Sequence, residues 1–492
     1  MDCNTYRKKQ TYSKLLFSLL FLFVASSLHA QPHQAYALLK RQPSLKNAQW
    51  GMVVRNLKTG KDLVLHNPDY SLTTGSTIKV LTTGTALAML GKDFKVQTTL
   101  AYTGSIDAAG TLQGDICIIG EGDPTLGCGR FGASSTPEAV LADWQAAVAK
   151  SGIRAIAGSV IGIQGYFEGP AQPDGWPFGD LGSYYGAGTG GLCWRENMYK
   201  LYFGTSTLGS AAMLKSMIPA NLPYTFDNQV TAGPAGSGDQ AYIYETTKEG
   251  ERLVQGTIPI LSTNFEVKGA IKNPALACAQ DLYMQLRAAK IEIAGTYKAQ
   301  DKISKGQNRT DILVLQSPSL EAIVGETNRE SINLFAETCL RWIAKANEGS
   351  GSTPKGIDKL KAFWKDRGLD LEGFLMQDGS GLSPANGVTP RQMTSILDKL
   401  SKDTNVGSAL RGSLSVMGQC GTLADMGKGS SAVGKVQAKS GTITRVLCYV
   451  GYAQGPGSDL AFAIMLNRYT GKFKDTKKAV EQALILDRKS VV

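Results

Sequence analysis

Alternating apolar and polar positions predict strands near both ends of the chain. Residues 50–66 hold two alternating apolar runs around Lys58-Thr59-Gly60, which is the pattern of a β-hairpin. Residues 435–469 hold three further apolar segments separated by turn residues, and a helical pattern follows at 475–488. Adjacent strands joined by short turns pair antiparallel. We therefore expect one five-stranded antiparallel sheet whose outer strands come from both ends of the chain.

Helical patterns surround these strands. Residues 76–94 form an apolar stretch of helical length that closes near Gly91, and it is apolar on nearly every side, so we expect it to be buried across the sheet. Four more helical patterns occur, at residues 275–295, 319–346, 356–369 and 389–403. Strands that gather in one layer with helices over it indicate the α+β class.

The segment from residue 95 to 267 has a different pattern. Short alternating runs are separated by Gly, Asp and Pro, and one helical stretch at 136–152 interrupts them. We therefore predict an inserted β-rich module at 95–267, with room for two subdomains, inside a discontinuous surrounding domain formed by residues 31–94 and 268–492.

Residues 1–30 predict export from the cytoplasm. A basic start precedes the apolar run 15–25 and a small-residue exit that ends at Ala30, as in a secretory signal peptide. The apolar run is shorter than the ~20 residues that span a bilayer. Leu28 is not ideal at the third position before the cleavage point, so an uncleaved membrane anchor remains the alternative. The expected location is the periplasm, after secretion across the inner membrane.

Composition narrows the chemistry. The 492 residues are 42% hydrophobic and 19% charged, as in globular proteins. Of three histidines only His66 lies well inside the body, which argues against a Ser-His-Asp hydrolase or a His-rich zinc site. Seven widely spaced cysteines follow the leader, an odd number that argues against a disulfide framework, although Cys117 and Cys128 are a pair that an oxidising compartment could close.

Charge gives weaker information. The formal charge is +11, and it becomes +8 without the leader, which holds four basic residues and one acidic residue. This excess suits an anionic polymer or surface nearby. No dense Lys/Arg run is interleaved with aromatic residues, so nucleic acid is not an expected partner.

Three short motifs occur in order along the chain: Ser76-Thr77-Ile78-Lys79, Ser331-Ile332-Asn333 and Lys439-Ser440-Gly441-Thr442. Each is weak alone. Ser352 and Lys355 repeat the first spacing, but Pro354 stands between them in a Gly/Ser-rich segment that reads as a surface loop. Ser76 differs from Ser352 because it begins a predicted buried helix and does not lie in a predicted surface loop.

Ser76 and Lys79 fall in the first turn of the predicted buried helix, where residues three apart share a face. A nucleophilic hydroxyl needs a base near neutral pH, and a desolvated lysine is the candidate when histidine is scarce. Burial and a second cation such as Lys439 would both lower the pKa of Lys79. The alternative is an ordinary solvated lysine on a core helix.

The third motif lies on a predicted strand. Lys439 and Gly441 should point to one face, and Ser440 and Thr442 to the other. A strand edge can bind an extended peptide through its main chain, and Gly441 would let that backbone approach closely. Lys439 with the hydroxyls of Ser440 or Thr442 can hold a carboxylate.

The ordered motifs resemble those of the penicillin-recognising serine enzymes. Together with the segments GSTIKVLTT, GDICIIGEGDPTL, WPFGDLGSYYGAGTGG, RESINLFAE, QDGSGLS and AKSGTIT, they are most similar to the class C low-molecular-mass penicillin-binding proteins, the D-alanyl-D-alanine carboxypeptidase/endopeptidase family. The likeness spans about residues 75–445. It departs from the family at Ser440, where Thr is commoner, and at Ile332, where Asp is common.

The resemblance implies a β-lactamase/transpeptidase-like fold and an acyl-enzyme at Ser76. Lys79 would be its base, and Ser331 with Lys439 would relay a proton. Asn333, Ser440, Gly441 and Thr442 would bind substrate. It implies peptidoglycan stem peptides as substrates, β-lactams as covalent inhibitors, and neither cofactor nor metal. Peripheral membrane or cell-wall association and a homo-oligomer stay open.

Two alternative functions remain at this point. One is a serine β-lactamase or esterase on the same scaffold, which rapid turnover of a β-lactam would favour. The other is a catalytically vestigial cell-wall binding protein, which failure of Ser76 to become acylated would favour.

Overall fold

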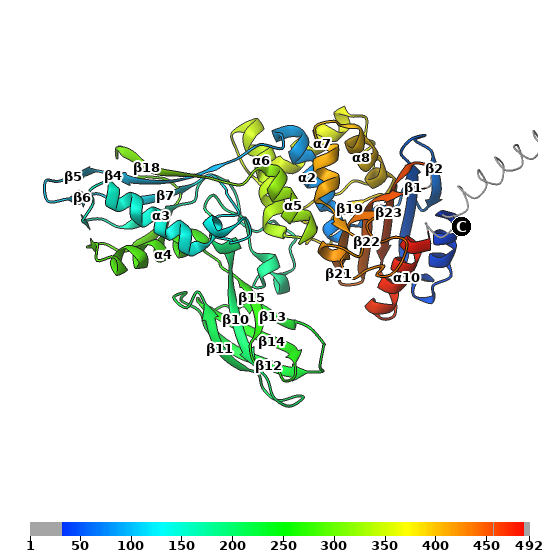
Figure 1. Cartoon of the computed structure of the whole chain (residues 1–492), viewed down its shortest axis with the longest axis horizontal. Helices are drawn as coiled ribbons and strands as arrows, with labels where there is room; N and C mark the ends of the chain where they lie inside the picture. Colours follow the sequence, from blue (N-terminus) through cyan, green and yellow to red (C-terminus); the bar gives the residue numbers. More distant parts are fainter. Residues whose placement is uncertain (1–31, 456, 487–492) are drawn as a thin grey trace, which may run out of the picture.

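The computed structural model describes residues 32–455 and 457–486, and its first layer is one antiparallel sheet. The strand order is β2-β1-β23-β22-β21-β20. The five predicted strands are present, and the two-residue β20 extends the sheet beyond β21 (Figure 1). Their bounds are Gln49–Asn56 (β1), Asp62–His66 (β2), Ser415–Val416 (β20), Val436–Ile443 (β21), Val446–Gln454 (β22) and Asp459–Asn467 (β23).

Both faces of this sheet are covered, as its sequence requires. Side chains of β22 alternate between two cores: Cys448 and Val450 face one, and Leu447 and Tyr449 face the other. The second core is closed by helical residues 32–40 and by α10 (Phe473–Leu486). A fully apolar strand such as β22 is therefore explained by burial on both sides.

A group of helices covers the first face. The buried α2 (Ile78–Leu90) follows a 3₁₀ turn, η2 (Gly75–Thr77), and ends at Gly91, whose φ of 84° suits glycine. The other helices are α5 (Leu320–Arg329), α6 (Asn333–Glu348), α7 (Thr353–Asp366), α8 (Pro390–Lys402) and α9 (Gly407–Ser413). A short pair, β3 (Leu72–Thr73) and β19 (Gly387–Val388), lies beside them.

Two helix boundaries differ from the sequence prediction. The single pattern at 319–346 is two helices, because the chain turns at Ser331, where φ is +60°. The Gly/Ser-rich segment expected to be a loop already ends at Ser352, which precedes α7. Lys355 therefore does lie on a helix near Ser352, but its side chain is exposed and stays hydrated.

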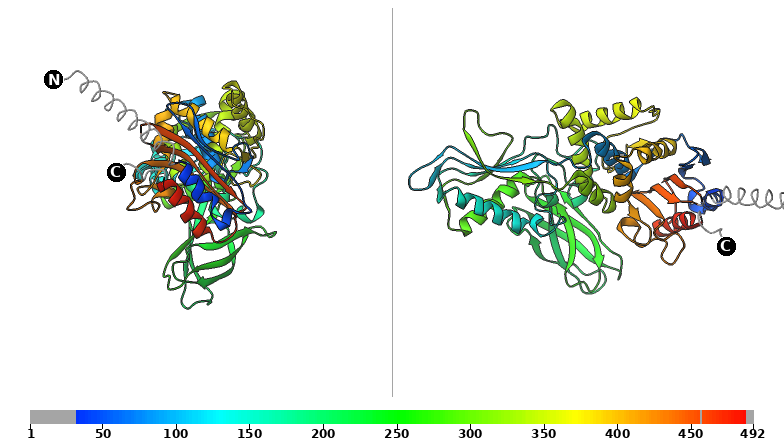
Figure 2. Two further views of the ribbon diagram at one scale, coloured as in Figure 1. Left: turned by 90° about the vertical axis from the view of Figure 1, so that its right-hand side faces the viewer. Right: turned by 45° about the horizontal axis from the view of Figure 1, so that its top comes forward.

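The remaining chain forms a large module beside the helices, with two parts (Figures 1 and 2). One part has a five-stranded sheet of order β17-β9-β7-β4-β18, a four-stranded sheet of order β16-β8-β6-β5, and two helices. Its elements are α3 (Pro137–Lys150), α4 (Pro274–Ala288), β4 (Gln97–Thr103), β5 (Ser105–Ile106), β6 (Thr111–Gln113), β7 (Ile116–Gly120), β8 (Ala155–Ile156), β9 (Val160–Ile163), β16 (Glu292–Ile293), β17 (Tyr297–Gln300) and β18 (Arg309–Gln316).

The second part of the module projects away from the first (Figure 1). It holds two three-stranded sheets of orders β11-β10-β15 and β12-β14-β13. Its strands are β10 (Met198–Gly204), β11 (Met213–Ile218), β12 (Thr225–Gly233), β13 (Gln240–Glu245), β14 (Glu251–Pro259) and β15 (Phe265–Ala270).

The predicted module boundary at residue 267 differs from the pairing of the strands. β18 pairs with β4, β17 pairs with β9, and α4 contributes Cys278 and Leu282 to the module's core. Residues 274–316, which the sequence pattern assigned to the surrounding domain, therefore complete the module. An amphipathic helix pattern shows that a helix buries one face, but not which sheet covers it.

Three sequence expectations concern export and cysteines. The predicted signal peptide, residues 1–30, lies outside the described residues. Within residues 32–486 apart from Pro456, no helix is long and apolar enough to cross a membrane. Cys117 and Cys128 are both free thiols, as are the other cysteines of the described chain.

Candidate active site

Ser76 and Lys79 meet as the helical spacing predicts. Ser76 lies in η2 and Lys79 in the first turn of α2, and the Lys79 Nζ atom donates to the Ser76 Oγ atom at 2.9 Å. Nζ also donates to Asn333 Oδ1 at 2.6 Å and to the Ser380 carbonyl oxygen at 2.5 Å. These three acceptors fix the nitrogen against the hydroxyl.

The surroundings of Lys79 favour its neutral form. The residue is fully buried, and burial lowers the pKa of its amine to about 7, while the nearby Asp378 and Glu337 carboxylates oppose this shift. An amine that titrates near neutral pH can accept the proton of a serine hydroxyl. The alternative of a solvated core-helix lysine does not fit this position.

Ser331 and Lys439 form a second pair. The Lys439 Nζ atom donates to Ser331 Oγ at 2.9 Å and to the Ser440 carbonyl oxygen at 2.8 Å. Burial is the largest cause that holds the pKa of Lys439 well below its ordinary value, and the charge of Lys79 adds to it. The left-handed backbone of Ser331 lets its side chain reach this lysine from the turn between α5 and α6.

The two lysines influence each other differently from the sequence expectation. That expectation had the charge of Lys439 help to lower the pKa of Lys79. In the structure, burial lowers the pKa of Lys79 against two carboxylates, whereas the Lys79 charge lowers the pKa of Lys439. The carboxylates beside Lys79 come from segments that the three motifs do not include.

Asn333 connects the site to the module. It is the first residue of α6; its Oδ1 atom accepts from Lys79, and its Nδ2 atom donates to the Tyr185 carbonyl oxygen at 2.8 Å. The amide is thereby held in one orientation, with a contact on each side. Tyr185 belongs to the module, so the module positions a side chain that touches Lys79.

Gly441 allows β21 to lie directly against the start of α2. A Cβ atom at this position would come within 2.5 Å of the Thr74 carbonyl oxygen and 2.9 Å of the Ser76 backbone nitrogen. Both distances are shorter than van der Waals contact permits. A Cβ at Gly75 would likewise lie 3.0 Å from the Thr442 nitrogen, so the backbone N–H groups of Ser76 and Thr442 lie near each other.

The edge of β21 beside this contact is open. β20 pairs only with Gln437 and Ala438, so in the described chain residues 439–443 have a strand partner only in β22. Thr442 is exposed there. An extended peptide can add to such an edge through main-chain hydrogen bonds.

Ser440 is placed differently from Thr442. Its Oγ atom donates to Thr422 Oγ1 at 2.8 Å, and the residue does not line the pocket around Ser76. The alternation of the strand puts both hydroxyls on one face, but Thr422 engages the Ser440 hydroxyl. Its role in substrate binding stays a prediction.

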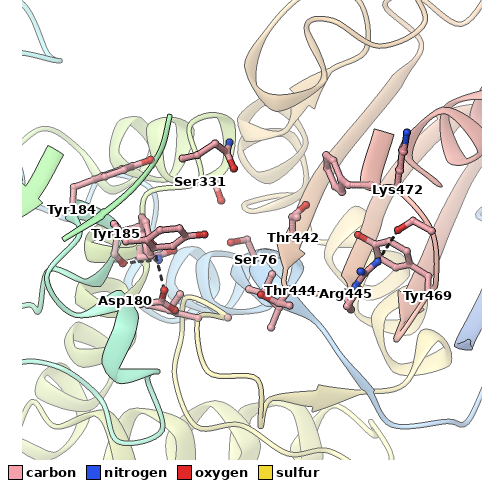
Figure 3. Close-up of a pocket in the computed structure, with 18 residues that line it drawn as sticks. Ser76, Asp180, Tyr184, Tyr185, Ser331, Thr442, Thr444, Arg445, Tyr469 and Lys472 are labelled. Carbon is pink, nitrogen blue, oxygen red and sulfur yellow. Dashed lines mark hydrogen bonds between the residues drawn. The ribbon is translucent and has the colours of Figure 1, made fainter. Parts of the chain in front are cut away.

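A pocket of about 960 Å³ surrounds the Ser76 hydroxyl (Figure 3). Ser331, Asn333 and Thr442 line it together with Ser76. On one side the module contributes Asp180, Tyr184, Tyr185, Gln240 and Tyr242. On the other side the turn between β21 and β22 and the segment that leads from β23 into α10 contribute Arg445, Tyr469, Gly471, Lys472 and Phe473. The site is therefore built from both parts of the chain.

The QDGSGLS segment, for which the sequence analysis had no role, holds the back of the site. The Asp378 carboxylate accepts from the backbone nitrogens of Ser380, Gly381 and Ser383 at 2.9, 2.5 and 2.7 Å. This turn presents the Ser380 carbonyl to Lys79. Trp176 of the module also donates to Asp378, at 3.1 Å. A carboxylate followed closely by Gly and Ser was the available sequence signal for such a turn.

Glu337 is a second residue that the motifs did not reveal. It lies one helical turn after Asn333, is fully buried, and its Oε1 atom accepts from the Ser380 nitrogen at 2.8 Å. Burial first, and the Asp378 charge second, raise its pKa to about 8. Its position four residues after Asn333, on the same helical face, was the available sequence signal.

Histidine and metal chemistry find no support at this pocket. His66 packs against Trp50 with ring centroids 4.0 Å apart, and it does not line the pocket. In the part of the chain that the structure describes, no group of three or more His, Cys, Asp or Glu side chains could hold a metal ion.

The amino-acid sequence is similar to a known protein family and to several of its members. The model of the D-Ala-D-Ala carboxypeptidase 3 (S13) family matches residues 33–488. A D-alanyl-D-alanine carboxypeptidase of Actinomadura sp. (strain R39) is 26% identical over 442 residues, which are 87% of this chain and 79% of that protein. The D-alanyl-D-alanine carboxypeptidase DacB of Haemophilus influenzae is 24% identical, over 87% of this chain and 88% of the relative.

A solved structure has the same fold. The crystal structure of penicillin binding protein 4 (dacB) from Haemophilus influenzae superposes with a TM-score of 0.77 at 23% identity, and the match covers 92% of this chain and 98% of that chain. The β-lactamase/transpeptidase-like α+β fold expected from the sequence is confirmed by this likeness.

Proposed function

Because the chain belongs to the D-Ala-D-Ala carboxypeptidase 3 (S13) family and is thus a serine-type D-Ala-D-Ala carboxypeptidase, we propose that Ser76 is the residue it acylates. The observation that supports this most is the 2.9 Å contact between Lys79 Nζ and Ser76 Oγ in a buried setting. The proposed substrates are peptidoglycan stem peptides and their cross-links.

Acylation begins with proton transfer inside this pair. Neutral Lys79 accepts the proton of the Ser76 hydroxyl as its oxygen attacks the carbonyl carbon of the penultimate D-alanine. Asn333 and the Ser380 carbonyl keep the amine in place during the transfer. The negative charge that develops on the carbonyl oxygen lies between the backbone N–H groups of Ser76 and Thr442.

The leaving group departs on the side of Lys439. Ser331 passes a proton to the amine of the departing D-alanine, and Lys439, bonded to Ser331 Oγ at 2.9 Å, resupplies it. Thr442 and the Ser440 hydroxyl, which is hydrogen-bonded to Thr422 Oγ1, hold the terminal carboxylate of the substrate. Gly441 keeps the strand close to Ser76, and Asn333 also contacts the substrate amide. Water then hydrolyses the ester.

Two further proposals follow from the same chemistry. β-Lactams acylate Ser76 and are released slowly, so they inhibit the enzyme. The enzyme is exported and acts in the periplasm, where its substrate polymer lies, with residues 1–30 as the export signal.

The proposal is tested with a synthetic peptide that ends in D-Ala-D-Ala. The wild-type protein should release D-alanine, and Ser76→Ala should reduce the rate by about a thousandfold or more, since the nucleophile is lost. Ser352→Ala is the matched control, because Ser352 also precedes a lysine by three residues. Equal loss in both variants, or none in Ser76→Ala, would refute the assignment. Rapid turnover of benzylpenicillin would instead favour a β-lactamase.

A further inference from the structure

The rim of the Ser76 pocket at the end of β21 carries two cations that the chemistry above does not use. Arg445 and Lys472 both line the pocket and are both exposed. In residues 32–486, Pro456 aside, no ion pair joins either side chain to a carboxylate of this chain. Figure 3 shows them on the opposite side of Ser76 from Asp180 and Tyr184.

Arg445 occupies an unusual backbone position. It lies in the two-residue turn between β21 and β22, where Ile443 pairs with Val446, and its φ is +60°. Glycine or asparagine takes this left-handed conformation at lower cost. A strained residue at a binding site is a reason to look for a function that requires its side chain.

The arginine is also held in place. Its Nη1 atom donates to the Gly471 carbonyl oxygen at 2.7 Å, and its carbonyl oxygen accepts from the Arg468 nitrogen at 2.7 Å. Its guanidinium lies 6.0 Å from the centre of the buried Tyr469 ring. These contacts tie the hairpin to the loop that holds Lys472, and both cations line the same pocket.

The direction of the substrate decides what this part of the pocket meets. If the terminal carboxylate lies at the Lys439 end of β21, an antiparallel peptide runs toward Arg445 with its upstream residues. Arg445 follows Thr442 by three residues, so their Cα atoms are at most about 11 Å apart, and less than that because residues 444 and 445 form the turn. A group about two residues and one short acyl cap upstream of the scissile carbonyl therefore reaches the cations.

We propose that Arg445 and Lys472 form a carboxylate-binding subsite that selects peptide substrates with an anionic group upstream of D-Ala-D-Ala. This inference rests on the proposed function of Ser76 and adds a preference for longer, acidic stem peptides. The subsite binds substrate and takes no part in bond cleavage.

The test compares two peptides that differ in one group. Nε-Acetyl-L-Lys-D-Ala-D-Ala is capped on its α-amine with succinate, which leaves a free carboxylate, or with the corresponding carboxamide. The wild-type kcat/KM should be about three- to tenfold higher for the carboxylate, chiefly through KM, as expected for an exposed charged contact. The ratio should fall as ionic strength rises.

Variants locate the effect. Arg445→Asn removes the cation with a residue that accepts positive φ, so the fold is retained, and Lys472→Gln removes the second charge. The double variant should bring the ratio close to one. Lys474→Gln with Lys478→Gln removes two exposed charges that do not line the pocket, and should leave the ratio unchanged.

The outcomes separate the two proposals. A wild-type ratio of one, a ratio that survives in the double variant, or an equal loss in the control would overturn the subsite. Acylation of Ser76 by benzylpenicillin is measured alongside: if it persists while the ratio is one, only the subsite fails. If Ser76 is never acylated, the proposed function fails, and the subsite with it.

Discussion

The Nζ atom of Lys79 lies 2.9 Å from the Oγ atom of Ser76 and also contacts Asn333 and the Ser380 carbonyl oxygen. All three N–H bonds of a protonated amine are therefore used. To act as a base the amine must lose one proton, and the same 2.9 Å contact then runs from the serine hydroxyl to the nitrogen. The pH at which this exchange occurs is set by the buried surroundings of Lys79.

The first prediction concerns the pH dependence of acylation. Since burial lowers the pKa of Lys79 to about 7, the acylation rate should rise with pH through about 7 and then level. Asn333→Asp places a carboxylate against the amine and should raise the pKa of Lys79, which moves the rising limb to higher pH. Stopped-flow measurement with a chromogenic β-lactam checks this. If the acylation rate of Asn333→Asp still rose near pH 7, a group other than Lys79 would control the pH dependence.

The second prediction concerns the contact between β21 and α2. Gly441→Ala puts a Cβ atom 2.5 Å from the Thr74 carbonyl oxygen, so the strand must move away from Ser76. Acylation should fall by about a hundredfold or more, as expected when reacting groups shift by about 1 Å. Gly412→Ala is the control, because among the described residues nothing beyond its chain neighbours and its own helix backbone lies within 4 Å of the added carbon. Equal acylation by both variants would contradict this role.

The third prediction concerns stability and Glu337. Its pKa is about 8 in the folded protein against an ordinary 4.5, so the unfolded chain loses this proton first as pH rises. The ionisation of Glu337 therefore lowers the free energy of unfolding between pH 4.5 and pH 7, by on the order of 3 kcal/mol. Glu337→Gln keeps the acceptor for the Ser380 nitrogen and removes the pH dependence.

Urea unfolding at the two pH values measures this effect. The stability gained by Glu337→Gln should grow between about pH 4.5 and 7. The exposed Glu321→Gln should show no such trend. A gain that is the same at both pH values would mean that Glu337 is already ionised in the folded state.

The fourth prediction concerns the module. Trp176→Phe removes a hydrogen bond to Asp378, at a cost of about 1–3 kcal/mol, and should slow acylation because Asp378 shapes the turn that presents Ser380 to Lys79. Trp144→Phe is matched to it: Trp144 is also a buried tryptophan of the module, but its Nε1 atom has no hydrogen-bond partner among the described residues. Trp144→Phe should lower stability without changing acylation. If both variants changed acylation equally, the contact of Trp176 with Asp378 would have no specific role at the site.

The sequence predicted the elements whose physical signals are local. Helical spacing placed Lys79 on the face of Ser76, and strand alternation placed Lys439 and Gly441 on the buried side of β21. Alternation near both ends of the chain also predicted the five-stranded antiparallel sheet. These signals need only a few neighbouring residues.

The remainder depended on contacts between distant segments. Asp378 lies far along the chain from Lys79 and Trp176, and no periodicity links them. The pairing of β18 with β4, and the Tyr185 carbonyl that orients Asn333, are likewise long-range. The site residues predicted from the sequence therefore all lie outside the module, whereas five residues of the module line the pocket.

The most direct test of the account is the intact mass of the protein after incubation with benzylpenicillin, followed by mapping of the labelled peptide. We predict that the wild-type chain gains one equivalent of the drug on Ser76 and that Ser76→Ala gains none while it keeps its fold by circular dichroism. Label that persists in Ser76→Ala, at Ser352 or elsewhere, would contradict the assignment of the nucleophile.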